Sequence, residues 1–328
     1  MKRNLRCCLL FCCIAAFLIT LPFITPTRSL ATEMLIFAIF ALGFDVLIGY
    51  TGLLSFGHAI FFGIGAYTTG IVLVRLVPSL FVALIVATAL SLLASYVVAF
   101  LSIRKKGIYF VMITLAFCQM FYFIGFKWTD LTGGDSGFHG VPRTSFGPVD
   151  LNSETALYFF VLAVFLLSVL LAFRIVNSPF GRVLKALKEN EDRAKSIGYN
   201  TTAFKTIAFM ISAFFASLAG GLYAVHSNFV PIDTLSIETS GDVVIMALLG
   251  GIGTLYGPVL GAMTVVFLKN FLSSWVGNWN LILGGIFVVS VLTVRQGIFP
   301  VIFGKIKEKI WVRKQPQRTG PEYPKRPL

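Results

Sequence analysis

Long apolar segments separated by short polar stretches run through most of the chain. They lie near residues 7–25, 34–50, 58–74, 79–101, 108–126, 155–173, 204–224, 243–268 and 281–299. A helix of about 20 apolar residues crosses the roughly 30 Å hydrocarbon core of a bilayer. None of these segments alternates apolar and polar residues as an outer-membrane barrel strand does, so helices remain as the spanning structure. The pattern predicts an all-α polytopic membrane protein with about 8–10 transmembrane helices.

Composition supports this class and narrows the alternatives. Hydrophobic residues make up 57% of the chain and charged residues 12%, with a mean hydropathy of +0.86. A soluble domain carries about 25% charged residues. The formal net charge of +13 would suit a nucleic-acid-binding protein, but the basic residues fall between and after the apolar segments. No basic module with interleaved aromatic residues occurs. We therefore expect a lipid bilayer, and no nucleic acid, around this chain.

The basic residues also predict which helix ends face the cytoplasm. Of the 27 Lys and Arg residues, 22 lie at the N-terminus, at 104–106, at 174–205 and in the tail that starts at Arg295. The stretch 127–154 has two basic and four acidic residues. Because Lys and Arg concentrate in cytoplasmic loops, we expect those four groups, with both termini, in the cytoplasm and 127–154 outside.

The two ends of the chain differ in character. The first segment starts with basic residues, as a signal peptide does, and Ser29-Leu30-Ala31 loosely resembles a cleavage site. Its apolar run exceeds the roughly 7–15 residues of a signal sequence, so we expect it to be retained as a helix. We expect one transmembrane domain over 1–300 and a basic, Pro-containing cytoplasmic tail over 301–328.

The last third of the chain does not fit a simple alternation of spans. Three spans after residue 205 would leave the basic tail outside, against the charge pattern. The passage "MALLGGIGTLYGPVLGAM" interrupts the apolar segment 243–268 with glycines and a proline. We therefore predict a broken or re-entrant helix near 243–268, a form tolerated at membrane depth where it is buried or lines a cavity.

No enzyme site can be recognised. The chain has no G-x-x-x-x-G-K-[ST] phosphate loop, no H-E-x-x-H and no G-x-S-x-G. Its cysteines lack partners at metal-ligand spacing and are interpreted as small apolar residues; they are Cys7, Cys8, Cys12, Cys13 and Cys118. We expect no catalytic residue, no metal and no resident cofactor.

Two ionisable residues lie inside apolar segments, where an unpaired charge costs several kcal/mol. Asp45 lies in "ALGFDVLIGY" and His58 in "SFGHAIF". Either they line a polar substrate path, or they hydrogen-bond each other or the backbone near the glycines. The residues predicted to line the path are Asp45, Thr51, Ser55, His58, Gly253 and Gly257.

The charged passage at 177–200 predicts a short amphipathic helix. Ser178 suits the N-cap and Pro179 the first helical position. Phe180, Val183, Leu184 and Leu187 follow helical spacing, whereas Arg182, Lys185 and Lys188 face the other way. Gly198 suits the end of a further short helix. Such a helix lies either on lipid headgroups or against a soluble partner.

Three passages together resemble a known family. "GYTGLLSFGHAIFFGIGAYTTG", "GRVLKALKENEDRAKSIGYN" and "LLGGIGTLYGPVLGA" are similar to blocks in the permease subunits of branched-chain amino acid ABC importers, most like the LivM type. The resemblance covers residues 34–300. It implies that 177–200 is the cytoplasmic loop that couples to the transporter's ATPase. The family's E-A-A-x-x-x-G signature corresponds to residues 192–198, where Asp and Arg replace the first two residues.

The resemblance also implies partners, cargo and coupling residues. It implies a second, LivH-like permease subunit, two ATPase subunits that bind the ATP, and an external binding protein docking near 127–154 and 226–242, all at the inner membrane. Leucine, isoleucine and valine are the usual cargo; urea or short-chain amides remain an alternative, as does an ion-coupled secondary transporter. The implied ATPase-coupling residues are Phe180, Arg182, Leu184, Leu187, Glu189, Asp192, Ala194 and Gly198.

Overall fold

The structure is a computed structural model that describes residues 27–143, 151–275, 281–282 and 284–288. Within them, six helical segments are long and apolar enough to cross a membrane. They are α2 (Arg28–Thr51), α3 with the π-helical turn η1 (His58–Ile71 and Val72–Leu76), α4 (Leu80–Ser102), α5 (Ile108–Lys127), α7 (Glu154–Asn177) and α10 (Thr201–Ser227). The predicted all-α polytopic class is confirmed. The segment 7–25, most of 281–299 and the tail 301–328 lie outside the described residues.

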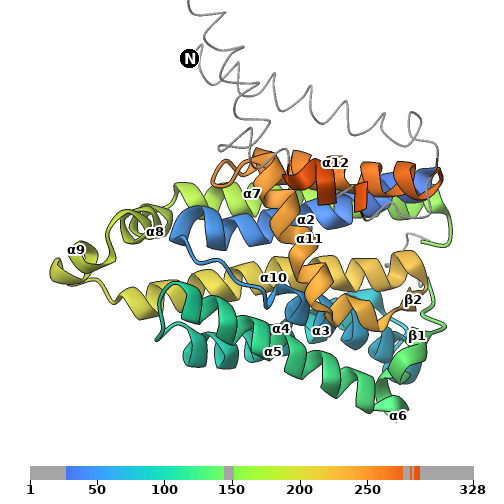
Figure 1. Ribbon diagram of the computed structural model, residues 1–328. Helices are drawn as coiled ribbons and strands as arrows, with labels where there is room; N and C mark the ends of the chain where they lie inside the picture. Colours follow the sequence, from blue (N-terminus) through green and yellow to red (C-terminus); the bar gives the residue numbers. More distant parts are fainter. Residues whose placement is uncertain (1–26, 144–150, 276–280, 283, 289–328) are drawn as a thin grey trace, which may run out of the picture.

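Helices α2, α3 and α10 form the centre of the bundle (Figure 1). Most residues of α2 are buried, and its hydropathy is that of a spanning helix. A Cβ on Gly220 of α10 would lie 1.9 Å from the carbonyl oxygen of Phe62 in α3. Only a residue without a side chain permits this approach, which brings two helix backbones into contact.

Helices α4, α5 and α7 lie at the periphery and present large apolar side chains outward. Leu93 of α4 is 66% exposed, Met112 of α5 is 61% exposed and Phe173 of α7 is 59% exposed. In a soluble protein such surfaces would be a liability. On spanning helices they are the surface expected to contact lipid.

The predicted break near 243–268 is confirmed, and it takes the form of a helical hairpin. Helix α11 (Ile237–Gly250) ends at Gly251, and α12 (Tyr256–Ser273) begins after a turn in which Gly253 has φ +83°. Gly250 packs against Gly257, and Gly261 against Met246, so the two helices are antiparallel. The apolar segment is therefore two packed helices. Figure 1 shows α11 crossing the bundle obliquely to reach α12.

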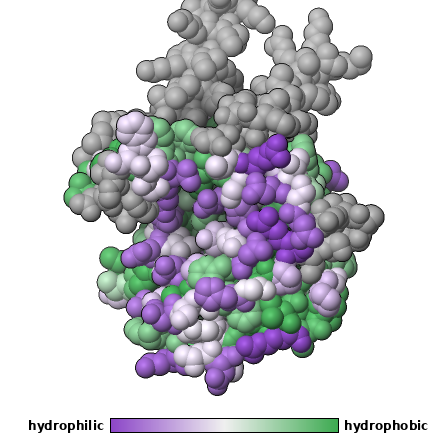
Figure 2. Space-filling model, turned by 90° about the vertical axis from the view of Figure 1, so that its right-hand side faces the viewer, coloured by the Kyte–Doolittle hydropathy of each residue, from purple (hydrophilic) through white to green (hydrophobic). Residues whose placement is uncertain are grey.

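Short elements close the end of the bundle opposite α8 and α9. Strand β1 (Phe138–His139) pairs antiparallel with β2 (Phe229–Val230), beside α6 (Thr129–Thr132), η2 (Gly134–Ser136) and η3 (Ile232–Leu235). Viewed from this end, polar side chains gather across the middle of the surface (Figure 2). We call this the β end.

The stretch 226–242, where a binding protein is expected to dock, is mostly regular structure. It comprises the end of α10, β2, η3 and the start of α11. His226 is 8% exposed, and Asp242 forms an ion pair within the helical hairpin. Asp233 and Glu238 are exposed.

Candidate functional site

Two short helices project beyond the long ones at the end opposite the β end (Figure 1). They are α8 (Pro179–Glu189) and α9 (Glu191–Ser196), and we call this the coupling end. The Ser178 hydroxyl accepts a hydrogen bond from the Gly181 N–H at 3.4 Å, and Pro179 occupies the first turn. The predicted N-cap and start of the helix are confirmed.

The apolar face of α8 packs into the chain's own core. Leu184 is 0% exposed and Leu187 is 3% exposed. The Phe180 ring stacks on Phe204 of α10 with 5.5 Å between ring centroids. The sequence pattern left open what this face contacts, and burial removes Leu184 and Leu187 from the surface that a partner could touch.

The basic residues of α8 are exposed, as expected, and two of them reach the end of α2. The Lys188 ammonium donates a hydrogen bond to the Gly49 carbonyl at 2.8 Å. The Lys185 ammonium lies 5.3 Å from the centroid of the Tyr50 ring. Both cations therefore lie at the last turn of α2, where the helix dipole favours positive charge. Arg182 and Glu189 are exposed.

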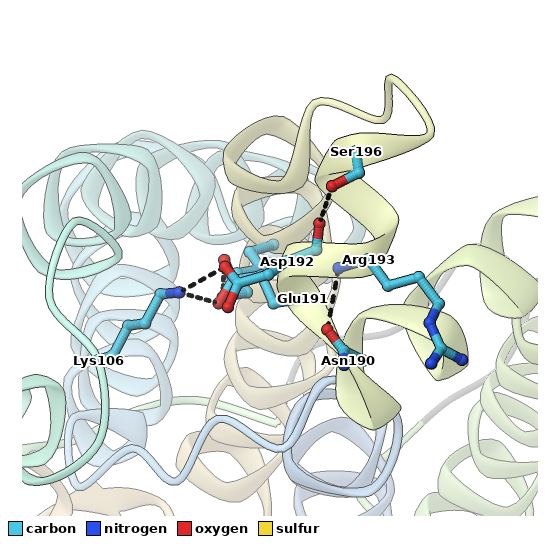
Figure 3. Close-up of polar contacts among 7 residues, drawn as sticks. Lys106, Asn190, Glu191, Asp192, Arg193 and Ser196 are labelled. Carbon is cyan, nitrogen blue, oxygen red and sulfur yellow. Dashed lines mark hydrogen bonds and ion pairs between the residues drawn. The ribbon is translucent and has the colours of Figure 1, made fainter.

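Helix α9 is held by an ion cluster (Figure 3). Glu191 lies 2.6 Å from the Lys205 ammonium of α10 and 3.0 Å from that of Lys106, between α4 and α5. Asp192 is 3.6 Å from Lys106 and is 89% exposed. Burial acts to raise the pKa of Glu191, but the hydrogen bonds and charges of Lys205 and Lys106 outweigh it and leave this pKa below its ordinary value. The hydrogen bond to Glu191 raises the pKa of Lys106.

Local structure explains the two signature positions that this chain keeps, Ala194 and Gly198. Ala194 is 3% exposed, so only a small side chain fits there. Gly198 has φ +98°, which is in the left-handed region. The Gly198 N–H bonds the Lys195 carbonyl and the Tyr199 N–H bonds the Ala194 carbonyl, which is the Schellman pattern. The predicted helix stop is confirmed.

A shallow groove of about 620 Å³ opens at the coupling end. Its lining comes from α8, α10 and the link that joins α9 to α10: Pro179, Phe180, Arg182, Val183, Ala186, Tyr199 and Phe204. The lining is mostly apolar, with one charged residue. The start of the loop, in α8, and the link that follows α9 thus line the same groove.

Asp45 fixes the turn of the α11–α12 hairpin. Its carboxylate accepts hydrogen bonds from the Gly253 N–H at 2.6 Å and the Leu255 N–H at 3.1 Å. Leu255 has φ +60°, a conformation that leucine rarely adopts. The Tyr50 hydroxyl donates to the Gly253 carbonyl at 3.2 Å. Of the alternatives drawn from the sequence, these contacts support the bonding of Asp45 to glycine-rich backbone.

The other predicted path residues also have partners inside the chain. The His58 ring lies 2.6 Å from the Ser212 hydroxyl and does not contact Asp45. Thr51 donates to the Leu47 carbonyl, and Ser55 accepts from the Gly57 N–H. All of these side chains are buried, and Gly257 packs on Gly250. In this conformation none of them faces an open path.

The sequence reasoning missed Lys106 and Lys205 as partners of Glu191, and it missed the pair Asp242–Lys269. A signal for the second pair existed. Asp242 and Lys269 stand immediately before and after the apolar segment 243–268, so folding that segment into a hairpin brings them to the same end of it.

The bundle of long apolar helices, the internal hairpin and the ordered loop at the coupling end define a polytopic helical membrane protein. Comparison with known sequences identifies its kind. The chain belongs to the family described as branched-chain amino acid transport system / permease component, which matches residues 27–292.

Individual relatives agree with this family. The chain is 28% identical over 313 residues to the high-affinity branched-chain amino acid transport system permease protein LivM of Salmonella typhimurium, covering 88% of this chain and 74% of that protein. It is 27% identical to LivM of Escherichia coli over 86% and 72% of the two chains. It is 28% identical to the autoinducer 2 import system permease protein LsrC of Yersinia pseudotuberculosis, over 51% of each. No solved structure matches.

Proposed function

We propose that this chain is a membrane-spanning permease subunit of an ATP-driven importer of branched-chain amino acids at the inner membrane. ATP hydrolysis belongs to separate subunits. Family membership and the two LivM relatives support the role and the cargo. A second permease subunit completes the pathway, and an external binding protein delivers the substrate.

The observation that carries this proposal is the attachment of the coupling end to the spanning helices. Helix α8 is tied to α2 through Lys188 and Gly49, and α9 is tied to α10 through Glu191 and Lys205. The last turn of α2 in turn holds the hairpin through Tyr50 and Gly253. A displacement applied to α8 and α9 therefore reaches α2, α10 and the hairpin through direct contacts.

We place the coupling end in the cytoplasm and the β end outside. Residues 174–205 and 104–106, which form the coupling end, carry 10 of the 27 Lys and Arg residues. By the positive-inside rule this is the cytoplasmic side. The basic residues of both termini lead us to place them in the cytoplasm as well.

The groove at the coupling end is the proposed seat of the ATPase. An apolar groove beyond the spanning helices is not covered by hydrocarbon, so a protein side chain is the fitting occupant. Arg182 lines the groove, and Glu189 and Asp192 are exposed on α8 and α9, where we propose that they add polar contacts. Phe180 lines the groove, whereas Leu184, Leu187, Ala194 and Gly198 hold the loop in shape.

The test is co-purification with the ATPase subunits. Ala186 is exposed and lines the groove, so Ala186→Trp fills the groove without disturbing the core. We expect this variant to insert normally and to lose the ATPase. Asp135→Trp, at the β end, is the matched control and should retain it. Full retention by Ala186→Trp would refute the assignment of the groove.

Cargo and energy source need their own assay. Uptake of labelled leucine by the reconstituted complex, in competition with urea, a short amide or another amino acid, separates the amino acid proposal from the amide alternative. Uptake driven by an ion gradient without ATPase subunits would favour a secondary transporter instead.

A further inference from the structure

An ion pair joins the two helices of the hairpin. The Asp242 carboxylate of α11 bonds the Lys269 ammonium of α12, and the two side chains are 25% and 27% exposed. Glu33 of α2 lies near enough to Lys269 to interact with it electrostatically. Three elements thus bring two acids and one base to one side of the chain.

The pair lies within the length of the apolar helices. At 1.5 Å per residue, Lys269 is about 20 Å along α12 from its start at Tyr256. That start lies beside the last turn of α2, because Gly253 contacts Gly49. A hydrocarbon core of about 30 Å therefore includes the level of Lys269.

A partly exposed charged pair at this depth is costly if its outer side meets lipid. The peripheral helices show what a lipid-facing surface of this chain looks like. Leu80–Ser102 and Ile108–Phe126 contain no charged residue, and their exposed side chains include Phe81 and Met112. The contrast indicates that the hairpin side faces protein or a polar passage.

Helix α11 carries a graded stripe on its exposed side. Glu238 is exposed, and Asp242, Ile245 and Leu249 follow at three- or four-residue spacing, each half-buried. A Cβ added to Gly241 would meet nothing within 4 Å, so there is open space beside Asp242. The stripe runs from charged to aliphatic along the helix.

We propose that Asp242 and Lys269 form a binding site for the charged groups of a zwitterionic amino acid on the pathway side of the hairpin. This site rests on the proposed function as an amino acid permease and deepens it. Lys269 receives the α-carboxylate, and Asp242 with Glu33 receives the α-ammonium. Ile245 and Leu249 contact the aliphatic side chain.

The chemistry of the pair suits a transient site. Without substrate, each charge is compensated by the other, so the empty site is not left with isolated charges. A zwitterion brings one charge of each sign and can replace both halves of the pair together. An uncharged amide or urea brings neither, and inserting it between the two residues would separate them without compensation.

The first experiment tests whether water reaches the side of the hairpin that carries Asp242. In the assembled complex, with the five native cysteines replaced, Gly241→Cys is treated with a small, charged, membrane-impermeant thiol reagent. We expect labelling that slows when leucine-loaded binding protein is added. Leu93→Cys on α4 is the control, and we expect it to stay unlabelled. Equal rates at the two positions would overturn the placement of the pathway.

The second experiment tests the charges. Asp242→Asn and Lys269→Gln should each lower ATP-driven leucine import more than tenfold while the complex still contains its ATPase. The double variant Asp242→Lys with Lys269→Asp restores an ion pair but reverses its direction, and we expect import to remain more than tenfold reduced. Recovery of import in the exchanged variant would show that the pair serves structure only.

Failure of the proposed function and failure of the Asp242–Lys269 site give different results. If the wild-type complex hydrolyses ATP but imports no amino acid, the proposed function fails and the site falls with it. If the wild-type complex imports leucine and both single variants do so at the same rate, the site alone is refuted.

Discussion

Replacing Glu191 by Gln should loosen α9 from the bundle. Glu191 is the partner of Lys205, whose side chain is only 8% exposed, at 2.6 Å. Breaking a fully buried pair costs about 3–5 kcal/mol, and an exposed pair is worth about 0–1 kcal/mol. Because Glu191 is 22% exposed, we expect an intermediate loss of about 2 kcal/mol in the free energy of opening α9. That corresponds to a roughly 30-fold larger open population.

Thiol labelling measures this opening directly. Ala194 is 3% exposed, so Ala194→Cys reacts only when α9 detaches. In that background Glu191→Gln should speed labelling about 30-fold. Asp192→Asn is the matched control: its carboxylate is 89% exposed and 3.6 Å from Lys106, so we expect less than about a twofold change.

The pH dependence follows from the lowered pKa of Glu191. A carboxyl whose pKa is depressed on folding stabilises the fold above its unfolded pKa and loses that effect as pH falls through the folded value. Labelling of Ala194→Cys, divided at each pH by that of a fully exposed cysteine to remove the pH dependence of the thiolate, should therefore be constant from pH 7 to about pH 4.5, the ordinary value for Glu, and rise below it. Glu191→Gln should show no such rise. Equal labelling rates for Glu191→Gln and Asp192→Asn would refute the reasoning. So would a rise in labelling at low pH that persists in Glu191→Gln.

Other substitutions test the core and the hairpin. Asp45→Ala leaves two partly buried N–H groups of the turn without their acceptor and should cost about 3 kcal/mol, read as a lower thermal midpoint in detergent. Asp135→Ala, at an exposed position, should leave the midpoint unchanged. Gly220→Ala places a Cβ 1.9 Å from a carbonyl oxygen and should lower the free energy of unfolding by about 3 kcal/mol, again read as a lower midpoint, whereas Gly241→Ala, with open space, should be neutral or slightly stabilising. Leu184→Asp should reduce the yield of folded protein rather than selectively release the ATPase, because Leu184 is fully buried; normal folding without ATPase binding would contradict this.

Local rules predicted the parts of this structure that depend on near neighbours in the chain. Ser178, Pro179 and Gly198 end or begin helices through bonds within a few residues. The charge pattern along the chain required a reversal after residue 225, and the glycine-rich passage located it.

Contacts between distant residues could not be predicted in this way. Asp45 and Gly253 are 208 residues apart in the chain, and no pattern around Asp45 separates a turn-binding carboxylate from one that binds substrate. Helical spacing likewise showed that α8 has an apolar face. Only the packing of α8 against α2 and α7 shows that this face belongs to the chain's own core.

The central claim is that this chain moves solute only when separate ATPase subunits act on its coupling end. The most direct measurement is uptake of labelled leucine into liposomes that hold either the isolated chain under an ion gradient or the full complex with ATP and loaded binding protein. We predict accumulation only in the second case, and none when the same components are combined with the Ala186→Trp chain. Accumulation by the isolated chain under the ion gradient alone would contradict the account.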